Sequence, residues 1–287
     1  MKKVGVIPNV KKDKDMVFTK QVVEWLKDKG LDPITTELKS KDKKVSNYVL
    51  SCEEVYKYSD FIVALGGDGT ILTVARTAAK LGTPILGINL GTLGFLTDTD
   101  KESAFDSLRK VIDGNYKIDK RMMLQCSIER AQKSSGSILA LNDFAVTKGL
   151  GAKIITYELS INGQYIHTYR ADGVVVASPT GSTAYSLSAG GPVLKPDASM
   201  IAITPVSPHM LFARPSVVSG DDEIKITNIS KQPINDTIFM IDGQNALTLK
   251  YNDAIVIKKA DYYTNIIKTN DIGYYDILHQ KMINIMK

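Results

Sequence analysis

A glycine-rich turn with one acidic residue is the part of this sequence best suited to phosphate chemistry. Residues Gly66–Thr70 read Gly-Gly-Asp-Gly-Thr and follow a short apolar run. Glycines let backbone amides approach phosphate oxygens closely and take positive φ, and the N-terminus of a following helix adds free N–H groups and a positive dipole end. We therefore predict that Gly66, Gly67, Gly69 and Thr70 form a phosphate-binding turn.

Asp68 lies in the middle of this turn and does not suit a pure phosphate cradle, because a bare carboxylate repels phosphate. The residue is better suited to act as a base toward a hydroxyl group, or as a partner of bound Mg²⁺. The competing interpretation is structural, with Asp68 capping the helix that follows a glycine turn. The spacing of these residues does not separate the two interpretations.

A second segment, Asp172–Pro192, is rich in Ser, Thr and Gly. Its hydroxyls and exposed amides can bind ribose and phosphate oxygens, and Tyr185 offers an aromatic face. A loop without a ligand is the alternative, although long loops inside compact domains are more often functional than idle. The sequence contains no GxxxxGK[ST], and no GxGxxG opens a helix after a strand. Nucleotide binding would therefore depend on a different binding motif, such as this segment.

The elements that must position these residues change in character along the chain. In the first third, short apolar runs alternate with helical patterns, which is typical of βαβ units and a mainly parallel sheet. The apolar runs Val4–Ile7, Phe61–Leu65 and Ile85–Ile88 predict strands, and helices are expected at about residues 18–26, 71–81 and 101–112. The Gly66–Thr70 turn then lies at the carboxyl end of a parallel strand, where open α/β sheets bind ligands.

From about Asp119 the pattern changes to alternating apolar and polar residues, which favours half-buried antiparallel strands. Asn162-Gly163 between two β-rich runs predicts a hairpin with a type I′ turn. We therefore predict an α/β N-terminal domain with a mainly parallel sheet at residues 1–118 and a mainly β, sandwich-like C-terminal domain at 119–265. A C-terminal tail at 266–287 has a helical composition and is expected to pack back on the N-terminal domain.

Composition excludes several classes of protein. Over 287 residues, 44% are hydrophobic and 23% are charged, as in a folded protein with a sizeable core. The net charge of +5 is spread along the chain and predicts no nucleic-acid partner. No apolar stretch approaches the roughly 18 residues of a membrane span, and Gly5 and Pro8 do not suit a signal segment, so we expect a cytoplasmic protein without a membrane partner. Neither Cys nor His shows metal-ligand spacing.

Three parts of the sequence together resemble the NAD kinase family: Gly66–Thr70, Asn142-Asp143 and Asp172–Pro192. The turn alone occurs also in diacylglycerol and sphingosine kinases, and a similar turn occurs in phosphofructokinases, whereas the run PTGSTAYSLSAGGP is far more specific. The resemblance covers nearly the whole chain. It implies an α/β domain followed by a β-sandwich-like domain, with the active site in the cleft between them.

The resemblance also implies an activity, which is the transfer of the γ-phosphoryl group of ATP to the adenosine ribose 2′-hydroxyl of NAD, giving NADP and ADP. ATP would act with Mg²⁺ or another divalent cation, held mainly by the ATP phosphates. The protein is expected to form a homodimer or homotetramer, with NAD and ATP as its small-molecule partners.

Individual roles follow from the resemblance. Asp68 would be the general base or orienting carboxylate, with Gly69 approaching the nucleotide. Asn142 and Asp143 would hold ribose hydroxyls or the diphosphate, although many relatives have Glu at position 143. The other implied NAD-binding residues are Phe95 and Leu96 near the adenine ring, Lys153 and Arg170 at a phosphate, Asp172 at the amine or ribose, Thr183, Ala184, Tyr185, Ser186, Leu187 and Ser188 on the adenine side, and Gln244. Lys153 and Arg170 are equally consistent with solvated side chains.

Three other functions compete with this interpretation. A lipid kinase of the same wider group would need an apolar channel or a membrane-facing surface, which the sequence does not show. A non-catalytic NAD(P)-binding regulator would use the same pocket without turnover, and the intact Asp68 and glycine turn argue against it. An NAD-dependent dehydrogenase lacks its glycine fingerprint and an obvious proton-relay residue.

Overall fold

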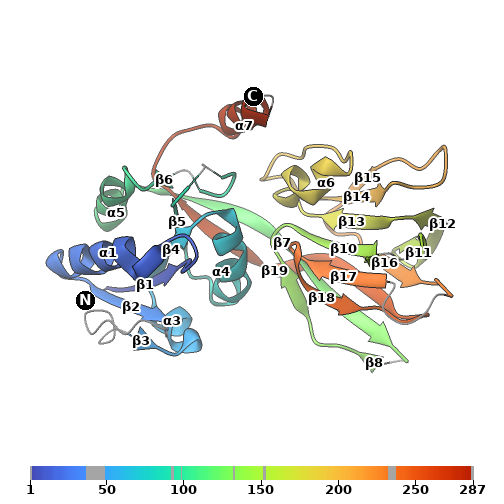
Figure 1. Cartoon of the computed structure of the whole chain (residues 1–287), viewed down its shortest axis with the longest axis horizontal. Helices are drawn as coiled ribbons and strands as arrows, with labels where there is room; N and C mark the ends of the chain where they lie inside the picture. The colour runs from blue at the N-terminus through green and yellow to red at the C-terminus, as the bar shows by residue number, and fades with distance from the viewer. Residues whose placement is uncertain are drawn as a thin grey trace. The chain divides into compact units, whose positions relative to one another are not determined.

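The computed structural model describes residues 2–36, 49–91, 94–97, 99–131, 133–150, 153–231 and 237–285 (Figure 1). The chain divides into two compact units. Unit 1 comprises Met1–Lys120 and Tyr263–Lys287, and unit 2 comprises Arg121–Tyr262. Within the described residues, no helix is both long enough and apolar enough to cross a membrane.

Unit 1 contains a parallel sheet with the strand order β3-β2-β1-β4-β5. Its strands are β1 (Lys3–Pro8), β2 (Asp32–Thr36), β3 (Val49–Leu50), β4 (Phe61–Gly66) and β5 (Ile85–Asn89), with the short β6 (Thr99–Asp100) beside β5. Every residue of β4 and β5 is buried. This burial on both faces explains why these strands are continuous apolar runs, as the sequence predicts.

Helices cover both faces of the sheet in unit 1 (Figure 1). The sheet is covered by α1 (Val17–Asp28), α3 (Cys52–Tyr58), α4 (Asp68–Leu81) and α5 (Ala104–Ile112). Unit 1 also contains η1 (Lys14–Met16) and α7 (Tyr274–Ile285). Side chains of α1 and α5 pack with Val4, Val63 and Leu65 in one hydrophobic cluster. On the other face, the Val55 side chain of α3 lies against Gly5, and the Ile71 side chain of α4 lies against Gly87.

Three boundaries differ from the sequence prediction. Helix α4 begins at Asp68, three residues earlier than expected, so the acidic residue of the turn is already helical. Helix α5 begins at Ala104 instead of near residue 101, because the Asp100 carboxylate accepts the Ser103 N–H at 2.8 Å and turns the chain before the helix. The tail is not helical throughout, because β19 (Ala254–Lys268) continues into it and Ile266 pairs with Ile85.

Unit 2 is antiparallel. One of its sheets has the order β15-β14-β13-β10-β17-β18, and the other contains β12-β11-β16-β19, with β7 pairing with β19, β8 and β9. The strands are β7 (Lys117–Arg130), β8 (Lys133–Ser134), β9 (Ile138–Ala140), β10 (Asp143–Lys148), β11 (Ile155–Ile161), β12 (Gln164–Ala171), β13 (Gly173–Ala177), β14 (Met200–Val206), β15 (Ser216–Ser219), β16 (Ile224–Asn228), β17 (Thr237–Ile241) and β18 (Gln244–Thr248). The parallel α/β part and the antiparallel β part confirm the predicted fold class.

The Asn162-Gly163 hairpin is also confirmed, since it joins β11 to β12. Both residues have positive φ, 50° for Asn162 and 76° for Gly163, as a type I′ turn requires. Asn162 additionally accepts the Glu223 N–H through its side chain at 2.9 Å. The turn therefore fixes the register of β11, which lies between β12 and β16.

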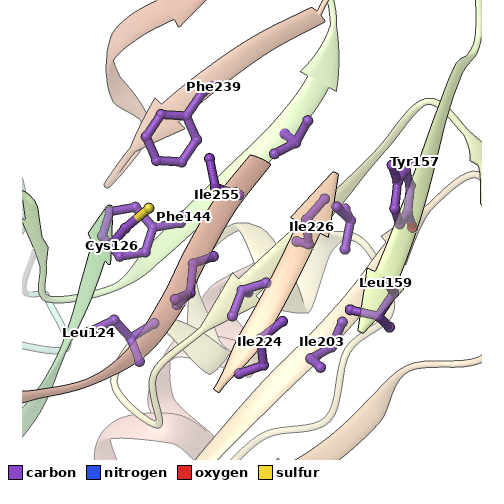
Figure 2. Close-up of a cluster of buried hydrophobic side chains, with 14 of the residues drawn as sticks. Leu124, Cys126, Phe144, Tyr157, Leu159, Ile203, Ile224, Ile226, Phe239 and Ile255 are labelled. Carbon is purple, nitrogen blue, oxygen red and sulfur yellow. The ribbon is translucent and has the colours of Figure 1, made fainter. Parts of the chain in front are cut away.

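The core of unit 2 lies between its two sheets (Figure 2). Phe144 of β10 stacks on Phe239 of β17, with ring centroids 5.6 Å apart. The opposite side is built from aliphatic side chains such as Ile224 and Ile226 of β16, together with Ile255 of β19. This packing of two inner faces is the sandwich that the alternating pattern predicts.

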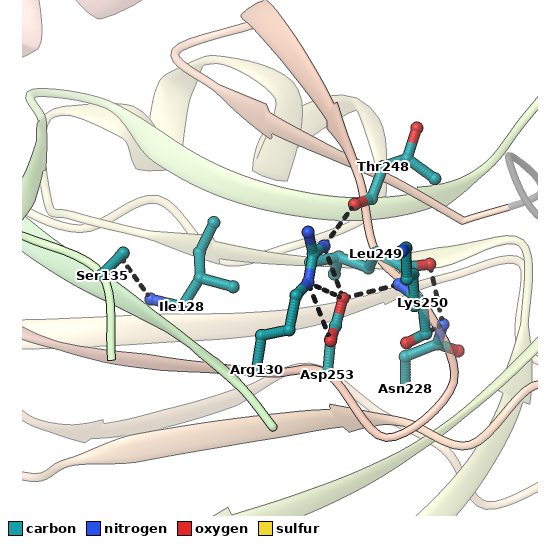
Figure 3. A network of polar contacts seen from close by, with 8 residues as sticks. All are labelled: Ile128, Arg130, Ser135, Asn228, Thr248, Leu249, Lys250 and Asp253. Carbon is teal, nitrogen blue, oxygen red and sulfur yellow. Dashed lines mark hydrogen bonds and ion pairs between the residues drawn. The ribbon is translucent and has the colours of Figure 1, made fainter. Parts of the chain in front are cut away.

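A charged network stabilises one end of this sandwich (Figure 3). The Arg130 guanidinium donates to both oxygens of Asp253, with a shortest distance of 2.6 Å from Nη2 to Oδ2. Asp253 also accepts the backbone N–H of Lys250 at 2.7 Å. Because the Asp253 side chain is only 4% exposed, these donors compensate for the cost of burying its charge.

Candidate nucleotide-binding residues

The Gly66–Thr70 turn connects the end of β4 to the start of α4, as the sequence predicts. The amides of Thr70 and Ile71 donate to the Gly67 carbonyl and begin the helix. None of the three glycines has positive φ, which corrects the expected reason for their presence. A methyl group on Gly66 would lie 2.1 Å from Thr70 Oγ1, so close packing requires glycine there. Gly69 is exposed and has open space above it.

Asp68 is held in one orientation by the backbone of residues 94–97. Its Oδ2 accepts the Phe95 N–H at 2.8 Å, and its Oδ1 accepts the Leu96 N–H at 3.1 Å. A methyl group on Gly94 would lie 1.8 Å from Oδ1, so only glycine allows this approach. The Thr97 hydroxyl also donates to Oδ1, at 3.5 Å. A carboxylate has about four lone-pair positions, so these three donors leave a position that can accept a hydroxyl proton.

Phe95 and Leu96 thus hydrogen-bond to Asp68 through their backbone N–H groups and not through their side chains. The Leu96 side chain is buried, whereas Phe95 is half-buried and has the Lys281 ammonium 5.9 Å from its ring centroid. The structure therefore brings Asp68 together with the residues that the resemblance associates with adenine. No signal in the sequence indicates that the contact uses main-chain amides.

In unit 2, Asn142 and Asp143 stand where β10 begins, beside a second carboxylate that the sequence analysis missed. Asp242, which directly follows β17, accepts the Asn142 N–H at 2.7 Å and the Asp143 N–H at 3.3 Å. It also accepts the Leu141 N–H at 3.3 Å. Three amide donors to one buried carboxylate fix the backbone on which Asn142 and Asp143 are carried.

The turn of residues 178–181 packs against the same backbone. Ser178 donates its hydroxyl to the Leu141 carbonyl at 2.5 Å, and its backbone N–H bonds to the Asn142 carbonyl at 2.8 Å. A methyl group on Gly181 would lie 2.0 Å from that Asn142 carbonyl oxygen. Glycine at 181 is therefore required for the close approach of two backbones.

Several hydroxyls of the Asp172–Pro192 segment point inward, which corrects the expectation that they are free to bind a ligand. Ser182 donates to the Pro179 carbonyl at 2.6 Å, and Ser186 shares a hydrogen bond of 2.9 Å with Thr204. Both side chains are fully buried. Their hydroxyls hold the 3-10 turn η2 (Gly181–Thr183) and the short helix α6 (Tyr185–Ser188) on the sheet.

The remaining residues of this segment stay accessible in part. Thr183, Ala184, Tyr185 and Leu187 are half-buried, and Ser188 is exposed. Burial raises the pKa of Tyr185, with further contributions from the charges of Asp143 and Asp172. The phenol of Tyr185 is therefore electrostatically close to two of the predicted site carboxylates.

The predicted basic and polar residues of unit 2 differ in their surroundings. Asp172 pairs with Lys148, a residue the sequence analysis did not single out, at 2.8 Å. Arg170, Lys153 and Gln244 are exposed. Among described residues, no cluster of three or more His, Cys, Asp or Glu side chains could hold a metal.

Because of the buried Asp143 carboxylate, we expect the free energy of unfolding to depend on pH. Burial, and secondly the charge of Asp242, raise the pKa of Asp143 to about 7. Its Oδ1 has no hydrogen-bond partner within the described part of the chain. An Asp in the unfolded chain titrates at about 3.9, so the folded protein binds an extra proton between these two values. The free energy of unfolding is therefore expected to fall as pH rises from about 4 to about 7.

This loss is expected to be on the order of 1 to 3 kcal/mol. Urea unfolding at pH 5 and pH 8 measures it, with Asp143→Asn as the variant that cannot titrate. The variant should lose this part of the pH dependence. The same pH dependence in both proteins would rule out Asp143 as its source.

Comparisons with known proteins agree with these features. The ATP-NAD kinase N-terminal domain matches residues 4–116, and the ATP-NAD kinase C-terminal domain matches residues 141–269. An NAD kinase from Caldanaerobacter subterraneus subsp. tengcongensis is 46% identical over 98% of this chain and 99% of its own length. The crystal structure of yeast NADH kinase complexed with NADH superposes with a TM-score of 0.82 at 25% identity, covering 94% of this chain and 84% of that one.

An NAD kinase from Archaeoglobus fulgidus in complex with ATP superposes with a TM-score of 0.76 at 28% identity, covering 97% of this chain and 98% of that one. The two family domains match both the part of the chain with the Gly66–Thr70 turn and the part with Asn142 and Asp172. The chain belongs to the NAD kinase family.

Proposed function

We propose that this protein transfers the γ-phosphoryl group of ATP to the adenosine ribose 2′-hydroxyl of NAD, giving NADP and ADP. The observation that carries the proposal is the Asp68 carboxylate, fixed by the amides of Phe95 and Leu96 at the N-terminus of α4. A carboxylate held this way beside a glycine turn combines a proton acceptor with free amides for phosphate.

In the proposed reaction the 2′-hydroxyl oxygen attacks the γ-phosphorus as the bond from that phosphorus to the β,γ-bridging oxygen breaks. The hydroxyl proton passes to Asp68 and then to solvent, so the products are NADP, ADP and one proton. Positioning and charge neutralisation supply most of the rate in such in-line transfers. Asp68 therefore orients the hydroxyl as well as accepting its proton.

We propose that a divalent cation such as Mg²⁺ acts as a partner of the nucleotide. Mg²⁺ keeps several waters and is commonly bound through one or two carboxylates plus substrate phosphates. Asp68 is the acidic residue of the turn that can offer such a carboxylate. When bound, the cation supplies neutralisation of phosphate charge.

For NAD we propose the residues that the resemblance identifies and that keep accessible surface. Asn142 is placed by Asp242, and Asp172 by its ion pair with Lys148. The others are Gly69, Phe95, Lys153, Arg170, Thr183, Ala184, Tyr185, Leu187, Ser188 and Gln244. For Asp143, Ser186 and Leu96 we propose a supporting role, because their side chains are buried.

The test is NADP formation by the purified protein with NAD, ATP and Mg²⁺, followed with an NADP-specific dehydrogenase. Turnover with NAD supports the proposal. NAD binding without turnover would instead identify a dinucleotide-binding regulator. We further propose a cytoplasmic homodimer or homotetramer, which light scattering after size-exclusion chromatography distinguishes from a monomer.

A further inference from the structure

We propose that Lys12 and Asn89 bind the terminal phosphates of the nucleotide donor above the Gly66-Gly67 turn. The inference rests on the proposed function, since it assigns the donor to this turn. Neither residue belongs to the motifs that the sequence analysis singled out. Lys12 follows the carboxyl end of β1, and Asn89 is the last residue of β5.

The strand order places these residues at the point where ligands of open α/β sheets bind. From β1 the chain continues to β2 and β3 on one side, whereas β4 and β5 lie on the other side. The order therefore reverses between β1 and β4, and a topological switch point is where such sheets form a binding crevice. Lys12 follows β1, the glycine turn follows β4, and Asn89 ends β5.

Lys12 brings a cation directly over the turn. Its Nζ lies 3.5 Å from the Gly66 carbonyl oxygen, and a methyl group on Gly67 would lie 2.8 Å from the same Nζ. A methyl group on Gly91 would lie 3.7 Å from it. Within the described ranges, Lys12 forms no ion pair with a carboxylate. Its positive charge is therefore available to an anion at the N-terminus of α4.

The loop that carries Lys12 is fixed to the turn. Asn9 donates its side-chain Nδ2 to Thr70 Oγ1 at 3.2 Å, and its backbone N–H donates to the Leu65 carbonyl at 2.7 Å. The Lys12 N–H donates to the Asn9 carbonyl at 2.9 Å. Asp13 accepts the Phe18 N–H at 3.0 Å and anchors the other end of the loop. Lys12 is therefore preorganised, which lowers the entropy lost on binding.

The second observation in favour of a phosphate site concerns the side-chain amide of Asn89. The residue is 1% exposed, and its Nδ2 has no hydrogen-bond partner among the described residues. Its Oδ1 accepts the Gly91 N–H at 3.2 Å, which fixes which end of the amide is the acceptor. A methyl group on Gly67 would lie 3.5 Å from that Oδ1, so the side-chain amide lies beside the turn with its oxygen nearest to Gly67. A buried unsatisfied N–H group is costly, and a phosphate oxygen that reached Nδ2 would satisfy it.

The ligand chemistry is that of a phosphate chain. An ammonium, a side-chain amide and the free amides of a helix N-terminus are all donors, and together they favour an oxyanion. Two sources could supply it, the triphosphate of the donor and the diphosphate of NAD. We assign the donor, because Asp68 is the group on this turn that is suited to the acceptor hydroxyl.

Binding of magnesium adenylyl imidodiphosphate, measured by calorimetry without turnover, tests the assignment. Lys12→Met is expected to weaken this binding by about tenfold to a hundredfold while changing the Kd of NAD by less than about twofold. Lys11→Met is the matched control, since Lys11 is an exposed neighbour without a contact to the turn's carbonyls. Asn89→Asp, which replaces a donor by a negative charge, should weaken analogue binding by at least about tenfold.

Unchanged analogue binding in Lys12→Met would overturn the inference, and a loss of NAD affinity alone would assign these residues to the dinucleotide instead. Both outcomes are independent of turnover. A wild-type protein that binds the analogue through Lys12 but makes no NADP would refute the proposed function and leave this inference standing.

Discussion

Replacing Asp68 with Asn is expected to lower kcat for NADP formation by about a hundredfold or more and to change the Kd of NAD by less than about twofold. The substitution removes the proton acceptor and also places an amide N–H₂ or a single oxygen opposite the N–H groups of Phe95 and Leu96. Because one acceptor oxygen remains, most of the loop geometry should persist. The measurement combines steady-state kinetics with calorimetric NAD binding.

The matched control is Asp100→Asn. Asp100 is also in unit 1 and also accepts a backbone N–H, from Ser103, but it stabilises the turn before α5 and has no role in the proposed site. Its variant should keep kcat within about twofold. If Asp68→Asn turns over at nearly the wild-type rate, the proposed base role is wrong. A large drop in Tm with loss of NAD binding would instead show that Asp68 acts as a structural cap.

The sequence predicts the local parts of unit 1 well, because their signals are local. A five-residue apolar run, three glycines and a helical pattern within residues 61–81 are enough to predict strand, turn and helix. The general rule for parallel sheets then places the turn at the carboxyl end of its strand, where ligands bind. The early start of α4 at Asp68 is a matter of boundary geometry that helical periodicity does not define.

The partners of the site residues are harder to predict, because they come from distant parts of the chain. Asp242 meets Asn142 only because β10 pairs with β17, and Lys12 meets Gly67 only because β1 pairs with β4. A pattern of neighbouring residues in the sequence predicts neither of these strand pairings. The direction of the Ser186 hydroxyl is equally hidden, since a serine can bind a ligand or bond within the fold, and here it bonds to Thr204.

Replacing Gly181 with Ala is expected to lower the free energy of unfolding by about 3 kcal/mol or more and to weaken NAD binding by at least about tenfold. The new methyl group would lie 2.0 Å from the Asn142 carbonyl oxygen and 2.4 Å from its carbonyl carbon. These are backbone atoms, so no side-chain rotation can relieve the overlap. Urea unfolding and calorimetry measure the two effects.

Neither backbone has room to move. The Asn142 N–H is held by Asp242 at 2.7 Å, its carbonyl accepts the Ser178 N–H at 2.8 Å, and Gly181 N–H is bound to Ser178 Oγ at 3.1 Å. Separating the two segments would break these bonds together and leave the buried Asp242 charge short of donors, which is costly. Gly136→Ala is the control, because a methyl group there meets nothing within 4 Å and should leave stability unchanged.

The Gly181 variant should also discriminate between the ligands. Asn142 and Gly181 belong to unit 2, whereas Lys12 and the glycine turn belong to unit 1. If the donor phosphates bind at the turn, Gly181→Ala should reduce NAD affinity far more than affinity for the ATP analogue. Equal losses for both ligands would mean that the damage extends beyond unit 2. A variant with wild-type stability and NAD affinity would show that the 178–181 turn shifts without cost, so that its contact with Asn142 does not position the dinucleotide.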